Sequence, residues 1–151
     1  MIRVASVNVN GVRAAFRKGM QPWLDASGVD VLALQEVRAE REDLVALLGD
    51  EWSVANDEAS AKGRAGVAIA TRAHQDAIRT TLGPDTVDTA GRWIEVDITT
   101  PEGNPLTIVS CYVHSGEAGT PKQDAKYEFL DIMSGRMQEI GTQSEYALVV
   151  G

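Results

Sequence analysis

Two amides and one carboxylate follow the ends of two strands predicted near the N-terminus. Asn8 and Asn10 close an alternating apolar stretch over residues 2–9, and Glu36 lies near the end of the apolar run 29–37. A short helix is predicted between the two strands, so they form a crossover unit and run parallel. The carboxyl ends of parallel strands meet at one edge of a sheet, where ligands bind in open α/β proteins. We therefore expect the amides and the carboxylate to lie side by side.

Oxygen ligands of this kind suit a hard divalent cation. Mg²⁺ is typically held by only one or two carboxylates together with water and phosphate, and Mn²⁺ accepts similar ligands. The alternative is that Asn8 and Asn10 cap a turn, while Glu36 pairs with Arg38 or Arg13. The spacing alone leaves both interpretations open.

The composition indicates a single domain spanning residues 1–151. Hydrophobic residues make up 44% of the chain and charged residues 24%, which gives no sign of a disordered or fibrous class. No apolar run is long enough to cross a bilayer, and the N-terminus lacks the pattern of a signal peptide. Since the chain has one cysteine, Cys111, we expect a cytoplasmic protein.

The net charge of −8 counts weakly against a nucleic-acid partner, because phosphate binding depends on clustered lysine and arginine. Many of the acids, however, fall on predicted solvent faces of helices. The basic residues in or beside predicted loops are Arg13, Arg17, Lys18, Lys62, Arg64, Arg92 and Lys122. The overall charge therefore does not exclude a nucleic acid.

The hydrophobic pattern predicts an α/β domain with a mixed sheet and flanking helices. The chain stops within a predicted buried strand at 146–151, so we expect the sheet to continue beyond it. The predicted helices are 20–28, 41–50 and 122–140, and the predicted strands are 2–9, 29–37, 51–57, 66–72, 76–82, 92–100, 106–114 and 146–151.

Two of these elements have clear faces. In the strand at 92–100, the inward residues are Ile94, Val96 and Ile98, and the outward residues are Glu95, Asp97 and Thr99. The turn 101–105 closes a hairpin with the next strand. The apolar stripe of the long helix consists of Phe129, Met133, Met137 and Ile140.

Four segments resemble the motifs of one enzyme family, in the same order along the chain. SVNVNGVRA (6–14) resembles the N-x-N-G-[ILV]-R signature of the exonuclease III and abasic-site endonuclease branch of the endonuclease/exonuclease/phosphatase superfamily, and VLALQEVR (31–38) resembles its L-x-L-Q-E-[TV]-[KR] signature. AGVAIATR (65–72) and SCYVHSGE (110–117), the latter followed by AKYEFLD, agree as well. The resemblance implies the N-terminal half of a DNase I-like, four-layer α/β sandwich.

The resemblance also implies roles for individual residues. Glu36 would be a direct metal ligand, and Asn10 would lie beside the same metal. Asn8 would organise the hydrogen bonds of the catalytic site, and Tyr112 would contact the scissile phosphate. Without the resemblance, Tyr112 would be read as an aromatic residue packed in the core.

Substrate-binding roles are implied for three more residues. Arg92 and Lys126 would lie near the DNA backbone, and Ser115 stands where relatives carry an amide that contacts phosphate. The motif in relatives is Y-[FV]-P-[NQ], whereas this chain has Tyr112, Val113, His114 and Ser115. His114 could supply a compensating donor.

The implied activity is that of a divalent-metal-dependent phosphodiesterase, with Mg²⁺ or Mn²⁺ as cofactor. Its partner would be double-stranded DNA with abasic sites or 3′ ends, and the full-length protein would be a monomeric DNA-repair hydrolase with 3′ to 5′ exonuclease and abasic-site endonuclease activity. The family's G-D-x-N and S-D-H motifs are not found in the 151 residues, so we expect a negligible catalytic rate from these residues alone.

Two alternatives remain open. One is a phosphatase or phosphodiesterase of the same superfamily that acts on small-molecule or lipid phosphates, which the acidic balance favours. The other is a non-catalytic scaffold domain.

Overall fold

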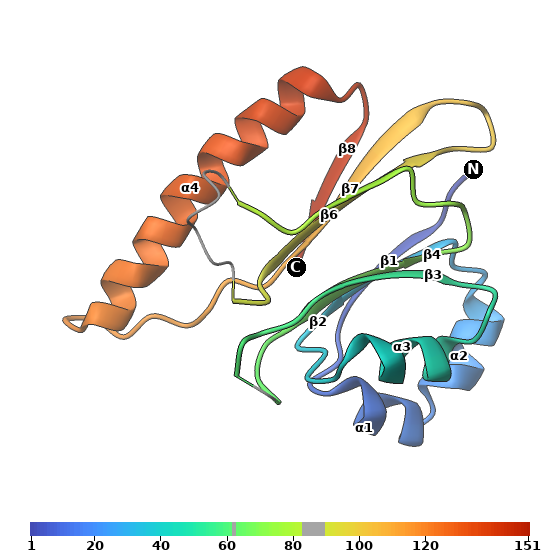
Figure 1. Cartoon of the computed structure of the whole chain (residues 1–151), viewed down its shortest axis with the longest axis horizontal. Helices are drawn as coiled ribbons and strands as arrows, with labels where there is room; N and C mark the ends of the chain where they lie inside the picture. Colours follow the sequence, from blue (N-terminus) through green and yellow to red (C-terminus); the bar gives the residue numbers. More distant parts are fainter. Residues whose placement is uncertain (62, 83–89) are drawn as a thin grey trace.

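In the described part of the chain, two four-stranded sheets pack face to face and helices cover their outer faces (Figure 1). The computed structural model describes residues 1–61, 63–82 and 90–151. The first sheet holds β1 (Val4–Asn8), β2 (Val31–Gln35), β3 (Ser53–Asp57) and β4 (Val67–Thr71), in the order β1-β2-β4-β3. The second holds β5 (Ala77–Arg79), β6 (Trp93–Thr99), β7 (Pro105–Cys111) and β8 (Ala147–Val150), in the order β5-β6-β7-β8. The helices are α1 (Val12–Arg17), α2 (Met20–Ser27), α3 (Arg41–Leu48) and α4 (Pro121–Gln143).

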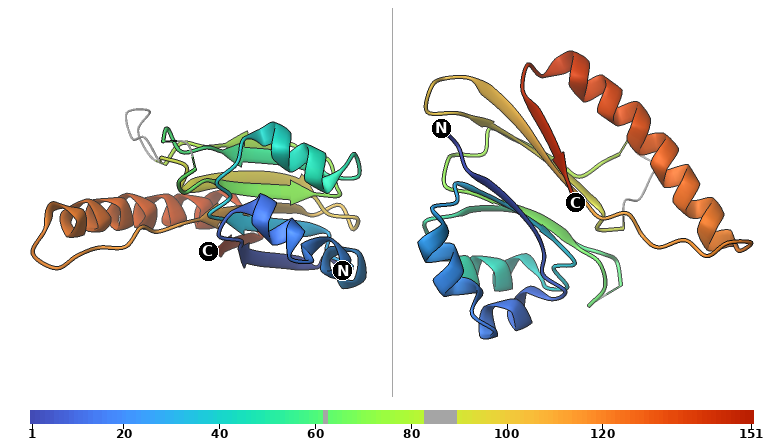
Figure 2. Two further views of the ribbon diagram at one scale, coloured as in Figure 1. Left: turned by 90° about the horizontal axis from the view of Figure 1, so that it is seen from below. Right: turned by 180° about the vertical axis from the view of Figure 1, so that it is seen from behind.

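The helices complete a four-layer arrangement. Helices α1, α2 and α3 lie on the outer face of the first sheet, and α4 runs along the outer face of the second (Figure 2). The predicted α/β class, with mixed strand directions and flanking helices, is confirmed. The strands divide between two sheets, as a four-layer sandwich implies, because apolar side chains on both faces of each sheet require cover on both sides. No helix among the described residues is long and apolar enough to span a membrane.

Strand β2 is buried at every position, as its continuous apolar run predicted. Leu32 and Leu34 point into the core beneath the helices, whereas Val31 and Ala33 point into the core between the sheets. β1 pairs with β2 in parallel, which confirms the crossover unit. Both strands therefore end at the same edge of the first sheet.

The second sheet contains the predicted hairpin, in which β6 pairs antiparallel with β7. Ile94, Val96 and Ile98 contribute to the core between the sheets, as their alternation predicted. Glu95 and Asp97 do point to the opposite face, but α4 covers that face. Glu95 is completely buried, so its expected position on an open face was wrong.

A network of charged groups anchors α4 to this sheet. The Glu95 carboxylate accepts hydrogen bonds from Arg79 Nε at 2.6 Å, from Arg136 Nε at 2.7 Å and Nη2 at 2.8 Å, and from Trp93 Nε1 at 2.9 Å. Arg79 also makes a two-pronged contact with Asp97, at 2.7 and 2.8 Å. The network joins β5, β6 and α4.

Two predicted apolar positions are more open than expected. Phe129 and Ile140 of α4 are buried, but Met137 is 41% exposed. At 3.6 residues per turn, Met137 points about 80° away from Phe129, whereas Arg136 deviates by only about 20° and takes the central position. In β8, expected to be buried, Leu148 is 38% exposed because the strand lies at the edge of the described sheet.

Candidate active site

The predicted meeting of amide and carboxylate occurs where β1 and β2 end. Asn8 is in register with Gln35, and the Asn8 side-chain Nδ2 donates a hydrogen bond to Glu36 Oε1 at 2.9 Å. Glu36 has a positive φ of 51°, a left-handed conformation that costs a non-glycine residue about 1 kcal/mol or more. Strain of this kind is concentrated at functional sites, because the surrounding structure must hold it in place.

The second sheet supplies a phenol to the same place. Tyr112 follows β7, and its hydroxyl lies near the Glu36 carboxylate, so that each group affects the pKa of the other. The Tyr112 backbone N–H donates to the carbonyl of Arg92 at 2.8 Å, and the Arg92 guanidinium lies 5.3 Å from the centre of the tyrosine ring. The tyrosine ring is partly buried against the core between the sheets, so it both packs and reaches the site.

The hydrogen bonds at this site keep the Glu36 carboxylate ionised. The bond from Asn8 lowers the pKa of Glu36 and, with the contributions of Arg38 and Tyr112, outweighs the effect of burial. Burial and the neighbouring charge of Glu36 raise the pKa of Tyr112. At neutral pH the site therefore pairs a charged acceptor with a protonated phenol donor.

The structure also contains contacts expected from the alternative interpretation, in which Asn8 and Asn10 cap a turn and Glu36 pairs with an arginine. Asn8 Oδ1 accepts a hydrogen bond from the backbone N–H of Asn10 at 3.1 Å, which caps the turn after β1. Glu36 forms an ion pair with Arg38, whereas Arg13 pairs with Asp43 at 3.5 Å. Capping orients the Asn8 amide so that its NH₂ group faces Glu36. The turn and the site are thus built by the same side chains.

A buried glutamine aligns the two halves of the site. Gln35, which is 1% exposed, lies between the sheets and donates from Nε2 to Ser6 Oγ at 3.2 Å and to Ser110 Oγ at 3.0 Å. Gln35 directly precedes Glu36, and Ser110 lies two residues before Tyr112. This role of Gln35 was not predicted from the sequence, because it depends on hydroxyl groups that lie far away along the chain.

Basic groups gather beside Tyr112 on the second sheet. The His114 ring packs edge-on against Phe129 of α4, with ring centres 6.0 Å apart. Burial, followed by the positive charges of Arg92 and Lys126, lowers the pKa of His114. Arg92 and Lys126 therefore both lie near the His114 ring.

A glycine fixes the approach to Arg92. Gly91 has a φ of 70°, and a Cβ atom at this position would lie 2.5 Å from the backbone nitrogen of Ala59. Its carbonyl accepts a hydrogen bond from Gly66 at 2.9 Å. Only glycine lets these loops meet so closely at the start of β6.

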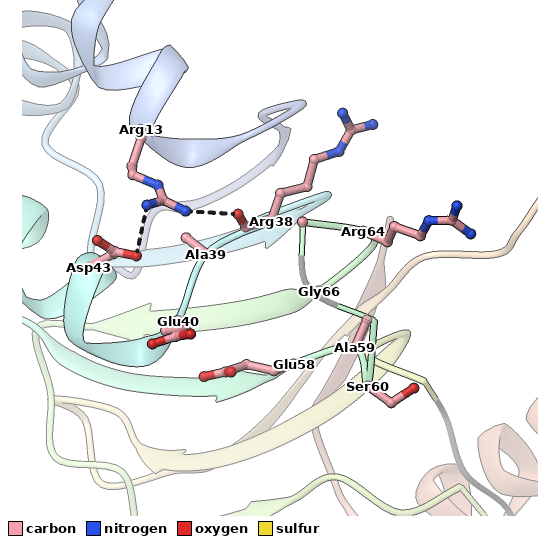
Figure 3. A pocket seen from close by; sticks show the side chains of 11 residues that line it. Arg13, Arg38, Ala39, Glu40, Asp43, Glu58, Ala59, Ser60, Arg64 and Gly66 are labelled. Atoms are coloured by element: carbon pink, nitrogen blue, oxygen red, sulfur yellow. Dashed lines mark hydrogen bonds and ion pairs between the residues drawn. The ribbon is translucent and has the colours of Figure 1, made fainter.

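A cavity of about 440 Å³ adjoins the site on the side of Arg38 (Figure 3). The side chains of Arg38 and Arg64 extend outward along one part of its rim, while Glu40 and Glu58 lie on another part. Glu58 Oε1 accepts a hydrogen bond from the backbone N–H of Arg41 at 3.0 Å and so caps the beginning of α3. Glu58 therefore stabilises the beginning of α3.

The sequence profile of the Endonuclease/Exonuclease/phosphatase family matches residues 5–151. The chain belongs to this family. Solved structures similar to this chain include an AP endonuclease from Archaeoglobus fulgidus, which is 25% identical with a TM-score of 0.77 over 92% of this chain and 52% of that chain.

Two further structures of similar fold are less identical in sequence. The 3′ phosphatase NExo from Neisseria, bound to product DNA hairpin, is 19% identical with a TM-score of 0.82, over 100% of this chain and 57% of that chain. The catalytic domain of Xenopus laevis APE2 is 20% identical with a TM-score of 0.79, over 98% of this chain and 57% of that chain. The chain thus spans little more than half the length of these proteins.

Members of the endonuclease/exonuclease/phosphatase family typically use divalent metal ions. The described residues hold no group of three or more His, Cys, Asp or Glu side chains that could bind a metal. The donor set nevertheless fits Mg²⁺, since one ionised carboxylate with nearby amide oxygens leaves the remaining positions to water and phosphate. Glu36 is the ionised carboxylate, and the exposed Asn10 directly precedes Gly11, whose backbone N–H donates a hydrogen bond to the Glu36 carbonyl at 2.7 Å.

One residue that was predicted to bind substrate, Ser115, does not contact the other described residues of the site. Ser115 is exposed in the loop after β7, and no contact joins it to Tyr112 or Arg92 among the described residues. The contacts that the structure describes at this site therefore involve Tyr112 and Arg92 and not Ser115.

Proposed function

We propose that this chain carries active-site residues of a divalent-metal-dependent phosphodiesterase acting on double-stranded DNA. The activities would be 3′ to 5′ exonucleolytic cleavage and incision at abasic sites in DNA repair. The observation that carries the proposal is the ionised Glu36, which accepts a hydrogen bond from Asn8 of the first sheet and lies near Tyr112 of the second sheet, beside a basic cluster.

In this proposal, Glu36 and Asn10 hold Mg²⁺ or Mn²⁺. The bound ion supplies positive charge where negative charge develops on the phosphate oxygens. Asn8 fixes the orientation of the carboxylate through its 2.9 Å hydrogen bond. The protonated hydroxyl of Tyr112 lies where it can turn from Glu36 and donate to a phosphate oxygen, a preorganised contact of the type that stabilises transition-state charge.

The DNA backbone would lie across the part of the site that the second sheet forms. Arg92 and Lys126 offer positive charge to phosphates there, and Ser115 offers an exposed hydroxyl from the neighbouring loop. Several acids that make the chain negative overall are engaged elsewhere, such as Glu95 and Asp97 beneath α4. The solved structures of similar fold include a DNA-bound 3′ phosphatase, which supports DNA over small-molecule phosphates. Monomeric state and cytoplasmic location belong to the same proposal.

Metal binding is the first test, because it can be measured on the 151 residues themselves. Mn²⁺ binding followed by electron paramagnetic resonance should be lost in Glu36→Gln. It should be kept in Glu51→Gln, a matched control whose side chain is 79% exposed and, like Glu36, forms an ion pair with an arginine, Arg72. Equal Mn²⁺ affinity in both variants would overturn the metal site.

Cleavage is the second test and is measured on the protein as its gene encodes it, since this chain spans about half of the similar structures. The substrates are an abasic-site duplex, a blunt duplex, a duplex with a 3′ phosphate, and inositol phosphates. Mg²⁺-dependent cleavage of the DNA substrates, lost in Glu36→Gln, is expected. Preferential release of phosphate from inositol phosphates would refute the DNA assignment and favour the small-molecule alternative, and activity unaffected by Glu36→Gln would favour a scaffold.

A further inference from the structure

A polar cluster interrupts the apolar core between the two sheets, next to the candidate active site. Gln35 of β2 and Ser110 of β7 are 1% and 0% exposed. Gln35 Nε2 donates hydrogen bonds to Ser110 Oγ at 3.0 Å and to Ser6 Oγ at 3.2 Å, and Ser110 Oγ donates to the Leu34 carbonyl at 3.0 Å. One amide therefore joins β1 and β2 to β7 at the end of the sandwich that holds the site.

Such a cluster adds direction more than it adds stability. A buried hydrogen bond contributes little net free energy, and replacing both of its partners by apolar groups of similar shape is nearly neutral. Its geometry is nevertheless restricted, because donor and acceptor must lie within a narrow range of distance and angle. Apolar contacts such as those of Val31, Ile69 and Ile108 hold the sheets together without a preferred direction. We therefore expect the amide to fix where β2 lies relative to β7.

A second connection between the sheets passes through the backbone. It starts at Val37, the residue after the site carboxylate, whose N–H donates a hydrogen bond to the Gly66 carbonyl at 3.0 Å. The Gly66 N–H donates to the Gly91 carbonyl at 2.9 Å, and the carbonyl of the next residue, Arg92, accepts from the Tyr112 N–H at 2.8 Å. This connection crosses between the starts of β4 and β6, whereas the amide crosses between β2 and β7.

Both connections begin and end beside the same two functional groups. Gln35 directly precedes Glu36, and Ser110 lies two residues before Tyr112. A single connection would let one sheet turn about it, whereas two connections at different strands fix distance and angle together. We propose that Gln35 is a positioning residue, which holds the Glu36 carboxylate in place relative to the Tyr112 hydroxyl through its bond to Ser110. Its effect on cleavage rests on the proposed function.

Nuclear magnetic resonance of labelled tyrosine rings measures this placement in the protein as its gene encodes it. The charge of Glu36 acts on Tyr112, so Glu36→Gln should displace the Tyr112 signal, which Tyr112→Phe identifies. The signals of Tyr127 and Tyr146, which are 58% and 48% exposed, should stay in place. In Gln35→Met the displacement should fall to about half or less, since a charge acts more weakly as the groups separate.

Turnover of an abasic-site duplex gives the second measurement. Gln35→Met should lower kcat about tenfold and leave KM nearly unchanged, because displaced catalytic groups lose contacts made in the transition state. Ser110→Ala removes the same hydrogen bond from the other sheet and should have the same effect. The double variant should be no worse than either single variant, whereas separate packing defects would add.

Stability separates positioning from a purely structural role. The melting temperature of Gln35→Met should stay within about 4 °C of the parent, because methionine has a similar shape and Ser110 keeps its bond to the β2 backbone. Thr71→Val is the control, since the buried Thr71 hydroxyl donates to the Ala73 carbonyl at 2.7 Å, at the far end of β4. This variant should leave the Tyr112 signal and kcat as in the parent.

An undiminished displacement of the Tyr112 signal in both Gln35→Met and Ser110→Ala, with each variant folded by circular dichroism, would overturn the inference. So would the absence of a displacement in the parent, or a fall in kcat that follows the loss of stability in every variant, Thr71→Val included. Failure of the proposed function looks different. The parent would then not cleave the duplex, while the response of Tyr112 to Glu36→Gln and its dependence on Gln35 would persist.

Discussion

Replacing Arg136 by glutamine should destabilise the protein more than any other single change in the charged network under α4. Arg136 gives Glu95 two of its four hydrogen bonds and half of its positive charge. Without it, the fully buried Glu95 carboxylate keeps only Arg79, which also serves Asp97. Two carboxylates would then share one guanidinium.

The magnitude follows from where the unpaired charge remains. Breaking a buried ion pair by removing one partner costs about 3–5 kcal/mol, a large part of the total stability of a domain this size. Glu95→Gln should cost less, because Arg136 keeps Glu139 at 2.8 Å and Arg79 keeps Asp97. Glu139→Gln should cost less than about 1 kcal/mol, since that carboxylate is 60% exposed.

Urea and thermal unfolding of the three variants measure these costs. At about 3 °C per kcal/mol, the melting temperature of Arg136→Gln should fall by about 10 °C. An Arg136→Gln variant no less stable than Glu139→Gln, or more stable than Glu95→Gln, would refute the assignment of unpaired buried charge.

The same network makes the stability of the folded protein depend on pH. Although burial raises it, the hydrogen bonds from Arg136, Arg79 and Trp93 bring the pKa of Glu95 below its ordinary value. Arg79 likewise lowers the pKa of Asp97. Unfolded carboxyl groups with pKa values of about 4 then bind more protons than the folded ones, so stability is fully present above that pH and falls as pH drops below it. The loss should be smaller in Arg136→Gln.

Two further predictions concern the site. Gly91→Ala should destabilise the protein by about 2 kcal/mol or more, because its Cβ would lie 2.5 Å from the Ala59 nitrogen at a left-handed φ, and the loss is measured by urea unfolding. Arg38→Gln should strengthen Mn²⁺ binding up to about fivefold, since the guanidinium competes for the Glu36 carboxylate in a partly exposed ion pair. Weaker Mn²⁺ binding in this variant would show that Arg38 supports the site instead of competing for it.

Local patterns were sufficient for the first half of the site. The apolar runs before Asn8 and Glu36 and the short helix between them predicted a crossover unit of parallel strands, whose polar ends were then expected to meet at one edge of the sheet. Both steps depend on residues close in sequence. The identity of the elements in this region was therefore accessible, while α1, which begins after Gly11, was not predicted.

The burial of Glu95 and the role of Gln35 could not be predicted, because both depend on contacts between residues that are far apart in the sequence. Alternation correctly placed Glu95 opposite Ile94, but it contains no information about α4, which covers that face from 41 residues away. Gln35 looked like an ordinary polar residue at a strand end until Ser110, 75 residues along the chain, placed a hydroxyl against it. A period of two predicts which face a side chain takes and not which element covers the face.

Because Glu36 and Tyr112 lie on different sheets, their relative position depends on how the two sheets of the sandwich pack against each other. Gln35 and Ser110 hold the sheets in register only one or two residues from these groups, so a slip between sheets would separate carboxylate from phenol. A ligand that bridges them would in turn clamp the sheets together. The smallest unit that preserves this chemistry is therefore both sheets, and transplanting either motif alone to another protein would transfer residues without a site.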